Sequence, residues 1–447
     1  MYIKNQKFLV LGVSKSGYAV AKKVIESGGK CYLFEQLKSD KIKGVLDELV
    51  SVGAVICNEE NVDNVLDIID VLVISPGVPI NHTVAVNAKR KGKRIIGELE
   101  FGYNCLMPTL VAVTGTNGKT TTCTMINAIL ESAKSKNFLV GNVGEPITSK
   151  VNQITNNDIC VTEVSSFQLE SVYAFNPHIS CVLNIAPDHL ERHYSMENYL
   201  FLKKRIFKNQ RESEYSVFNY DDEVVRGFYN ESRAKTLWIS TKEKVEGGYL
   251  KDGALYYFDE KIIEENKLAL TGLHNVYNAL FAIVVAKLLK VDNEVIAETL
   301  KNLKGVRHRI EFIKTVNGVD YYNDSKATNV ASTVTALENM KKPTVLIIGG
   351  SEKGEAYDNL FAKIKETPVK HVIITGDSKY SMLDASGKNG YSSVTVTPDF
   401  EYAVKIARLI SEEGDNVLLS PACASFDCFK DYEERGDKFV SLIGEFN

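Results

Sequence analysis

Short apolar runs without polar alternation recur along the chain and predict buried strands. In the first hundred residues these runs are "KFLVLG", "KCYLFE" and "DVLVISPG", and a helix is expected at 18–27 between the first two. Strands of this kind, separated by helical stretches, are typical of a parallel sheet that is covered on both faces. We expect this segment to close near residues 97–100.

The same alternation continues through the rest of the chain. "TLVAVT", "ICVTEV", "SCVLNI" and "TLWIS" predict further strands, and residues 274–290 predict a helix that is apolar along one broad face. Residues 248–263 alternate around "KDGA", which predicts a small antiparallel hairpin. After residue 306 a hairpin turn at Asn317-Gly318 precedes "DYYND", and three more strands follow in "TVLIIGG", "HVIITG" and "NVLLSPA".

These elements predict an α/β chain of three domains. We expect a Rossmann-like domain at 1–98, a P-loop-type central domain at 99–305 and a second Rossmann-like domain at 306–447. The central domain should hold a mostly parallel sheet and a small antiparallel sheet. Ligands of such sheets bind beyond the carboxyl ends of the strands.

Composition and charge narrow the function classes. The 447 residues are 44% apolar and 25% charged, with a net charge of −4, so a nucleic-acid partner is not expected. An uncharged apolar stretch of about 20 residues, which a membrane span needs, is not found. The N-terminus lacks a signal-peptide pattern, and the eight cysteines form no C-x-x-C pair. We therefore expect reduced thiols and a cytoplasmic location.

The stretch "VAVTGTNGKTTT" at 111–122 resembles a phosphate-binding loop. It follows a buried strand and opens a helix, and it ends in the Gly-Lys-Thr of the G-x-x-x-x-G-K-[ST] pattern, although Val113 stands where the first glycine belongs. N–H groups at a helix N-terminus hold phosphate oxygens. Lys119 would neutralise the terminal phosphates, and a hydroxyl of Thr120 or Thr121 would reach Mg²⁺.

Other polar residues also stand at predicted strand ends. Glu163 follows one apolar strand, Asp188 and His189 follow another, and Lys203 lies on a later helix. Glu163 is a magnesium-ligand candidate opposite a phosphate loop, and the cluster favours a second metal position.

Two further motifs leave alternatives open. Gly12-x-x-x-x-Gly17, with Glu35 ending the next strand, imitates a dinucleotide fingerprint, but Ser14 replaces its middle glycine. A structural turn is about as plausible as a ligand site, and an NAD site is less plausible than either. His274 and Asn278 share one face of a helix, where Asn275 is a candidate cap.

Taken together, these motifs resemble the Mur ligase family across all three segments. The resemblance rests, in chain order, on "TGTNGKTTT", "TEVSSFQLE", "DHLERH", "HNVYNA", "HRIEF", "NDSKATN" and "SPACASFDCFKDYEERG". It implies an ATP-dependent amide ligase of peptidoglycan precursor synthesis. Its substrates would be UDP-N-acetylmuramoyl-L-alanine and D-glutamate, joined through an acyl phosphate. Another Mur-type or folylpolyglutamate-type ligase is the nearest alternative; an ATP-hydrolysing switch and an NAD oxidoreductase are more distant ones.

The resemblance also implies a role for individual residues. The sugar nucleotide would contact Ser14, Lys15, Ser16, Glu35, Ser75, Pro76, Gly77, Asn142 and Ser165. ATP would contact Gly115, Thr116, Asn117, Gly118, Lys119, Thr120, Thr121, Asn278, Arg309 and Asp324. D-glutamate would lie among Lys326, Thr328, Lys353, Ser425 and Tyr432, although the family often has Phe at the last position.

The catalytic residues implied are Lys119, Glu163, His189 and Lys203. Two Mg²⁺ ions would be held by Thr120, Glu163, His189 and Lys203. Lys203 matches the lysine that the family carbamylates, and its spacing from Tyr199 and Arg205 fits better than that of Lys204. We further expect a monomer with neither a nucleic-acid nor a membrane partner.

Overall fold

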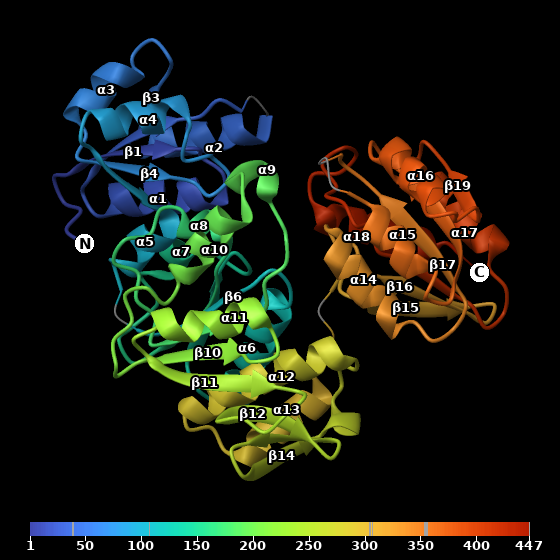
Figure 1. Ribbon diagram of the computed structural model, residues 1–447. Coiled ribbons are helices and arrows are strands. Elements are labelled where there is room, and N and C mark those ends of the chain that lie inside the picture. The colour runs from blue at the N-terminus through green and yellow to red at the C-terminus, as the bar shows by residue number, and fades with distance from the viewer. Residues whose placement is uncertain (38–39, 107, 304, 306, 353–355, 447) are drawn as a thin grey trace. The chain divides into compact units, whose positions relative to one another are not determined.

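The computed structural model describes residues 1–37, 40–106, 108–303, 305, 307–352 and 356–446 (Figure 1). The chain divides into two compact units, Met1–Leu303 and Lys304–Asn447. The strands of the described residues form three sheets, two in the first unit and one in the second. Within the described residues, no helix combines the length and apolar character that crossing a membrane requires.

The first sheet is parallel throughout, with the strand order β3-β2-β1-β4-β5. Its strands are β1 (Lys7–Leu11), β2 (Lys30–Phe34), β3 (Val55–Cys57), β4 (Val71–Ile74) and β5 (Arg94–Gly97). The helices between and after them are α1 (Lys15–Glu26), α2 (Asp40–Ser51), α3 (Val62–Ile68), α4 (Thr83–Arg90) and α5 (Glu98–Tyr103). The order changes direction at β1 and β4, so the loops after these two strands lie side by side at the carboxyl edge.

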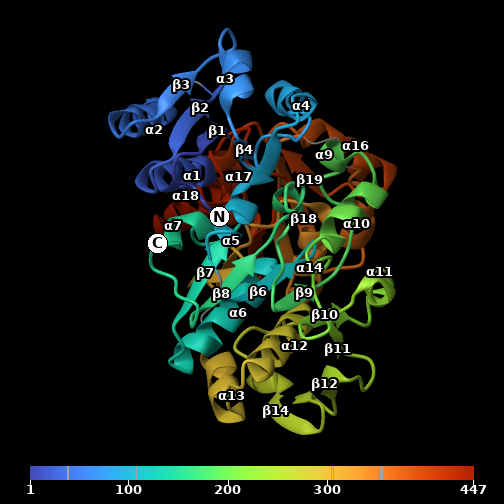
Figure 2. The same cartoon turned by 90° about the vertical axis from the view of Figure 1, so that its left-hand side faces the viewer.

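The second sheet has the order β14-β13-β12-β11-β10-β9-β6-β8-β7. Its parallel strands include β6 (Thr109–Thr114), β7 (Asn137–Gly141), β8 (Ile159–Glu163), β9 (Ile179–Val182), β10 (Tyr215–Asn219) and β11 (Lys235–Ser240). Strand β12 (Gly247–Lys251) pairs in parallel with β11 and so continues this sheet. Strands β13 (Ala254–Tyr257) and β14 (Glu260–Glu264) follow it, each antiparallel to the strand before it. In Figures 1 and 2 the first sheet and the β12–β14 strands lie at opposite ends of this unit.

The helices of the second sheet divide its core into two clusters. On one side lie α6 (Lys119–Ser132), α12 (Leu273–Leu288) and α13 (Asn293–Asn302), with apolar side chains such as Ile126, Ile129 and Phe281. The other cluster holds Phe175, Phe207 and other aromatic residues. The shorter helices are α7 (Ile147–Lys150), α8 (Ser166–Leu169), α9 (Leu190–His193), α10 (Met196–Lys204) and α11 (Glu223–Gly227).

The sheet of the second unit has the order β15-β16-β20-β17-β18-β19. Its strands are β15 (Glu311–Val316), β16 (Val319–Asn323), β17 (Thr344–Gly349), β18 (Val369–Thr375), β19 (Val394–Val396) and β20 (Asn416–Leu419). Its helices are α14 (Val330–Asn339), α15 (Asp358–Ile364), α16 (Lys379–Lys388), α17 (Phe400–Ile410) and α18 (Tyr432–Gly444). Apolar clusters lie on both faces of this sheet.

The α/β class, the mainly parallel sheets and both predicted hairpins are confirmed. The helix expected at 18–27 begins at Lys15. Strands β3, β5, β7, β10 and β19 were not predicted. The short β3 and β19 carry too few residues to show a pattern, and β7 is only partly buried.

Candidate active site

The loop between β6 and α6 has the form of a phosphate-binding turn. Gly118 has a φ of +84°, and a Cβ atom there would lie 2.5 Å from Asn278 Oδ1. Asn278 is buried on α12, where the same Oδ1 accepts a hydrogen bond from Thr122 Oγ1 at 3.1 Å. The first N–H groups of an α-helix have no helical acceptors and attract anions. The loop can therefore offer several N–H donors to one phosphate group.

Contacts from β9 hold this loop in shape. Asn184, just after β9, accepts from Asn117 N–H at 2.8 Å and donates to its carbonyl at 3.1 Å. Lys119 Nζ donates to the carbonyls of Gly115 and Thr116 at 2.9 and 2.7 Å. Asn184 was not predicted, and its only signal in the sequence is a polar residue after an apolar strand. Its role depends on the pairing of β9 with β6, which the sequence does not reveal.

Glu163 lies at the end of β8, next to the loop. One carboxylate oxygen accepts from Thr120 Oγ1 and the other from Asn142 Nδ2, each at 2.7 Å. Strands β6 and β8 are neighbours, so the structure brings Thr120, Asn142 and Glu163 together. Thr121 is buried within the first turn of α6.

Lys203 is buried beside the same loop, at the end of α10. Its Nζ donates to Thr114 Oγ1 at 3.0 Å and to Gly115 O at 2.8 Å. Burial, and then the positive charge of Lys119, lower the pKa of the Lys203 amine well below its usual value. The adjacent Lys204 instead pairs with Glu231 away from the loop. Of the two lysines, Lys203 is therefore the one whose surroundings favour the neutral form of the amine.

His189 lies at the start of α9, in the left-handed backbone region with a φ of +55°. Its Nε2 is 3.6 Å from Asp188 Oδ2, and its ring centroid is 4.7 Å from that of Phe167. Asp188 and Glu163 both act electrostatically on Lys203. The "DHLERH" segment therefore lies near the loop, as its predicted role requires.

The donor set beside the loop fits a hard divalent cation. The Thr120 hydroxyl and the Glu163 carboxylate offer oxygen atoms at one point. Among the residues that the structure describes, there is no group of three or more His, Cys, Asp or Glu side chains that could hold a metal ion. A hydroxyl next to one carboxylate suits Mg²⁺, which keeps water ligands and binds through one or two carboxylates together with substrate phosphates.

All the predicted sugar-nucleotide residues except Asn142 and Ser165 lie at the carboxyl edge of the first sheet. Glu35 accepts from Val13 N–H at 2.6 Å and from Leu37 N–H at 2.8 Å, and Ser75 Oγ donates to Gly12 O at 2.6 Å. A Cβ atom at Gly17 would lie 1.9 Å from Gly12 O. The glycine motif thus has a structural role, because it lets α1 approach the loop after β1.

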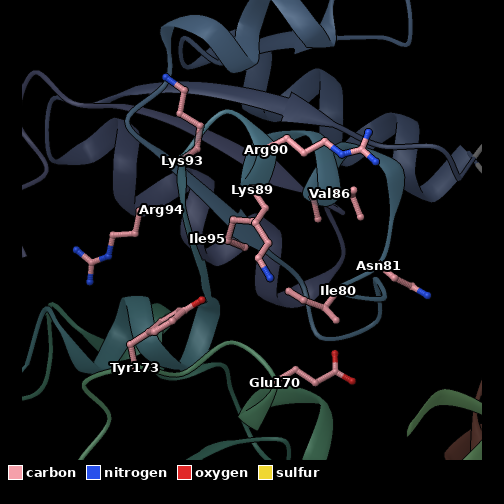
Figure 3. A pocket seen from close by; sticks show the side chains of 11 residues that line it. Ile80, Asn81, Val86, Lys89, Arg90, Lys93, Arg94, Ile95, Glu170 and Tyr173 are labelled. Carbon is pink, nitrogen blue, oxygen red and sulfur yellow. The ribbon is translucent and has the colours of Figure 1, made fainter. Parts of the chain in front are cut away.

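The exposed residues of that edge open onto a cavity. Ser14 and Lys15 line a space of about 540 Å³ between α1, α2 and α7, and Ser16 follows them in α1. Pro76 and Gly77 lie in the loop after β4. Ser165 caps α8, where its Oγ accepts from Gln168 N–H at 3.3 Å. A larger cavity of about 960 Å³, shown in Figure 3, contains none of the predicted site residues.

On α12 one expectation was wrong. Asn275 is not the helix cap, because the helix begins at Leu273 and Gly272 takes the capping position. Asn275 Nδ2 instead donates to Thr271 O at 2.9 Å, and its Oδ1 accepts from Asn278 at 3.2 Å.

In the second unit, Asp324 follows β16 and is completely buried. One oxygen accepts from Ser420 Oγ at 2.7 Å and the other from Ile310 N–H at 3.2 Å. Burial raises the pKa of Asp324 to about 6, and the nearby charge of Arg309 opposes this shift. Arg309 Nε is buried and makes no hydrogen bond within the described residues.

The other predicted residues of this unit that the structure describes lie in the segments after β16 and β20 and at the start of α18. Lys326 Nζ donates to Tyr432 Oη at 3.1 Å and lies 4.9 Å from the centre of its ring. Thr328 is half-buried in the turn after Lys326, and Ser425 is buried in the segment after β20. Lys353 lies outside the described residues.

Arg435, on α18, is a buried residue that the sequence analysis missed. Its guanidinium donates to the carbonyls of Ser325, Cys423 and Ala424 at 2.8–3.1 Å and to Ser325 Oγ at 3.0 Å. It therefore joins the "NDSKATN" and "SPACAS" segments. From the sequence alone, an arginine on an amphipathic helix is expected to be exposed to solvent, so only the fold reveals this contact.

A glycine-lysine loop between a buried strand and a helix, with a carboxylate on the adjacent strand, defines a P-loop-like α/β protein. Residues 113–286 match the family model of the Mur ligase middle domain, and residues 308–423 match that of the Mur ligase, glutamate ligase domain. The chain belongs to the Mur ligase family.

Relatives of known name match along the whole chain. It is 38% identical to a UDP-N-acetylmuramoylalanine--D-glutamate ligase from Clostridioides difficile, with 99% of each chain covered. It is 40% identical to the enzyme of that name from a Thermoanaerobacter species, covering 100% of this chain and 99% of the relative. The UDP-N-acetylmuramate-alanine ligase of Thermotoga maritima shares the fold, with a TM-score of 0.63, 20% identity, and 99% and 100% coverage.

Proposed function

We propose that this chain is an ATP-dependent ligase that joins D-glutamate to UDP-N-acetylmuramoyl-L-alanine. The reaction class rests on one observation: Lys119, Glu163 and the buried Lys203 surround a phosphate-binding turn. The substrates are supported by the full-length similarity to ligases of that name.

A carboxylate does not acylate an amine unaided, because its leaving group is poor. In the proposed reaction an alanyl carboxylate oxygen attacks the γ-phosphorus of ATP, and the bond to the bridging oxygen of ADP breaks. The D-glutamate amine then attacks the acyl-phosphate carbonyl carbon. The tetrahedral intermediate loses inorganic phosphate and a proton, which leaves the amide.

The residues of the first unit would bind and orient the reacting groups. The N–H groups of α6 would hold the ATP phosphates, and Lys119 Nζ would move from the Gly115 and Thr116 carbonyls to the γ-phosphate, where negative charge develops. The loops that carry Ser14 and Ser75 would hold the uridine diphosphate.

Thr120, Glu163, His189 and Lys203 would hold magnesium, at two positions in our proposal. Bound cations would supply charge neutralisation for the phosphoryl group. For Lys203, the neutral amine attacks CO₂, a C–N bond forms, and loss of a proton leaves a carbamate. This change gives a buried amine the oxygen atoms that a hard cation prefers.

In the second unit, Arg309 and Asp324 would contact the nucleotide. Lys326, Thr328, Lys353, Ser425 and Tyr432 would surround D-glutamate.

The direct test combines the protein with ATP, Mg²⁺, UDP-N-acetylmuramoyl-L-alanine and D-glutamate, and follows phosphate release and the ligated product. Release that requires both substrates supports the proposal. Release with another amino acid in place of D-glutamate contradicts the substrate assignment, and release without either substrate indicates a simple ATPase.

A second test addresses the loop itself. Lys119→Ala should abolish turnover while UDP-N-acetylmuramoyl-L-alanine still binds, because that ligand lies at the first sheet. Lys301→Ala, on the exposed face of α13, is the matched control and should keep full activity. Turnover by Lys119→Ala at the wild-type rate would show that the loop lysine is not catalytic.

A further inference from the structure

Arg192, on α9, makes an ion pair that is largely shielded from solvent. Its Nε and Nη2 donate to the two carboxylate oxygens of Glu170 at 3.0 and 2.6 Å. The two side chains are 13% and 9% exposed. The guanidinium also lies over the Phe167 ring, 4.5 Å from its centre. Bidentate geometry and a stacked ring fix the orientation of an arginine more firmly than a single contact does.

The same guanidinium reaches the loop after β4. Nη2 donates to Val78 O at 3.1 Å and Nη1 to Gly77 O at 3.5 Å. These carbonyls directly follow Ser75 and Pro76, which are predicted to contact the sugar nucleotide. Figure 3 shows the Glu170 side chain close to Ile80, which belongs to the same loop.

A second hydrogen bond joins the same two segments. Asn81 Nδ2, at the far end of the loop, donates to Tyr194 Oη at 2.9 Å. The C-terminal end of α9 thus contacts residues 77–81 at two points, through Arg192 and through Tyr194. Tyr194 has a φ of +67°, so the backbone turns sharply as it leaves this helix.

The N-terminal end of this short helix carries His189, a residue of the proposed magnesium site. His189 precedes α9 and packs on the same Phe167 ring that supports Arg192. His193 Nε2 lies 2.9 Å from Ser166 Oγ, and its Nδ1 is 3.5 Å from Glu170. Arg192 and His189 are therefore linked by a shared aromatic ring and by a single helical turn.

We propose that Arg192 is a positioning residue that couples the sugar-nucleotide loop at residues 75–78 to the magnesium-nucleotide side of the site at His189. This inference rests on the proposed function. A purely structural ion pair with Glu170 would need no contact with the loop carbonyls. Because Arg192 touches both segments, binding at one should change the affinity at the other, and the effect should be reciprocal.

The test measures this linkage by binding rather than by turnover. The dissociation constant of UDP-N-acetylmuramoyl-L-alanine is determined by calorimetry with and without Mg²⁺-ADP. In the wild type the two values should differ by at least about fivefold, the lower end of ordinary coupling. In Arg192→Lys, which keeps the charge but loses the planar fork, the ratio should approach one.

Two further variants sharpen the result. Arg226→Lys is the matched control, because Arg226 stacks on Tyr220 within its own turn, and it should keep the wild-type ratio. Asn81→Ala removes only the second contact and should reduce the ratio in part. It also provides the test if Arg192→Lys does not fold, as judged by its melting temperature.

The proposal is overturned if the two dissociation constants of the wild type are equal. It is also overturned if Arg192→Lys shows the same ratio of dissociation constants as the wild type while its turnover falls. The second outcome would mean that Arg192 is only structural. Failure of the proposed function would look different: the wild type would not form product from D-glutamate.

Discussion

Gly118 offers a quantitative test of how the phosphate-binding loop is built. Its φ of +84° and the nearby Asn278 side chain both disfavour a side chain at this position. Gly118→Ala should therefore destabilise the first unit through two separable effects, one in the backbone and one in packing.

The structure sets the size of each effect. A left-handed backbone costs an L-residue about 1–2 kcal/mol relative to glycine. The new methyl group would lie 2.5 Å from Asn278 Oδ1, and Asn278 is buried and tied to Thr122. Overpacking of this kind costs about 1–3 kcal/mol. The total loss in the free energy of unfolding should be about 2–5 kcal/mol.

Gly253 supplies the control for the backbone term. It has a φ of +69° in the hairpin turn between β12 and β13, and a Cβ atom there would meet no atom within 4 Å. Gly253→Ala should therefore show the backbone cost alone, about 1–2 kcal/mol.

Urea unfolding followed by the fluorescence of Trp238 measures these changes, since this single tryptophan lies on β11 of the same sheet. The double variant Gly118→Ala/Asn278→Ala removes the clash. It should be about 1–3 kcal/mol more stable than the sum of the two single changes predicts. Additive effects would refute the steric argument, and so would equal losses for Gly118→Ala and Gly253→Ala.

Three further predictions follow from other contacts. Asp324 has a folded pKa of about 6, above its unfolded value, so its contribution to stability is full below pH 4 and lost as the pH rises through 6. Asp324→Asn should therefore gain about 2 kcal/mol relative to the wild type between pH 4 and pH 7 in calorimetric unfolding, and a pH-independent difference would contradict the assignment. If Lys203 is carbamylated as proposed, Lys203→Ala should lower kcat at least about 100-fold and regain activity with added acetate or formate, which would replace the oxygens of the proposed carbamate, whereas Lys204→Ala should be nearly normal. Asn184→Ala should raise the KM for ATP about tenfold in steady-state assays by releasing the loop at Asn117, and an unchanged KM would show that the loop holds its own shape.

The sequence alone was sufficient for the elements that carry a strong local pattern. Long apolar strands such as β6, β17 and β18 can be predicted because a parallel sheet buries both of its faces. The Asn317-Gly318 turn can be predicted because few other residues adopt the backbone conformation of such a turn. The short or half-exposed strands β3, β7 and β19 carry no such pattern and could not be placed.

The candidate catalytic residues could also be predicted from the sequence, because Lys119, Glu163 and Lys203 are charged residues next to apolar runs. The tertiary structure alone decided which of them meet. Strand order places β6 between β8 and β9, so Glu163 reaches Thr120 and Asn184 reaches Asn117 across neighbouring strands. Burial, which depends on the whole fold, distinguishes Lys203 from Lys204 and gives Arg192 and Arg435 their partners. Local pattern fixes where polar groups stand along the chain, but long-range packing fixes their neighbours and their charge state.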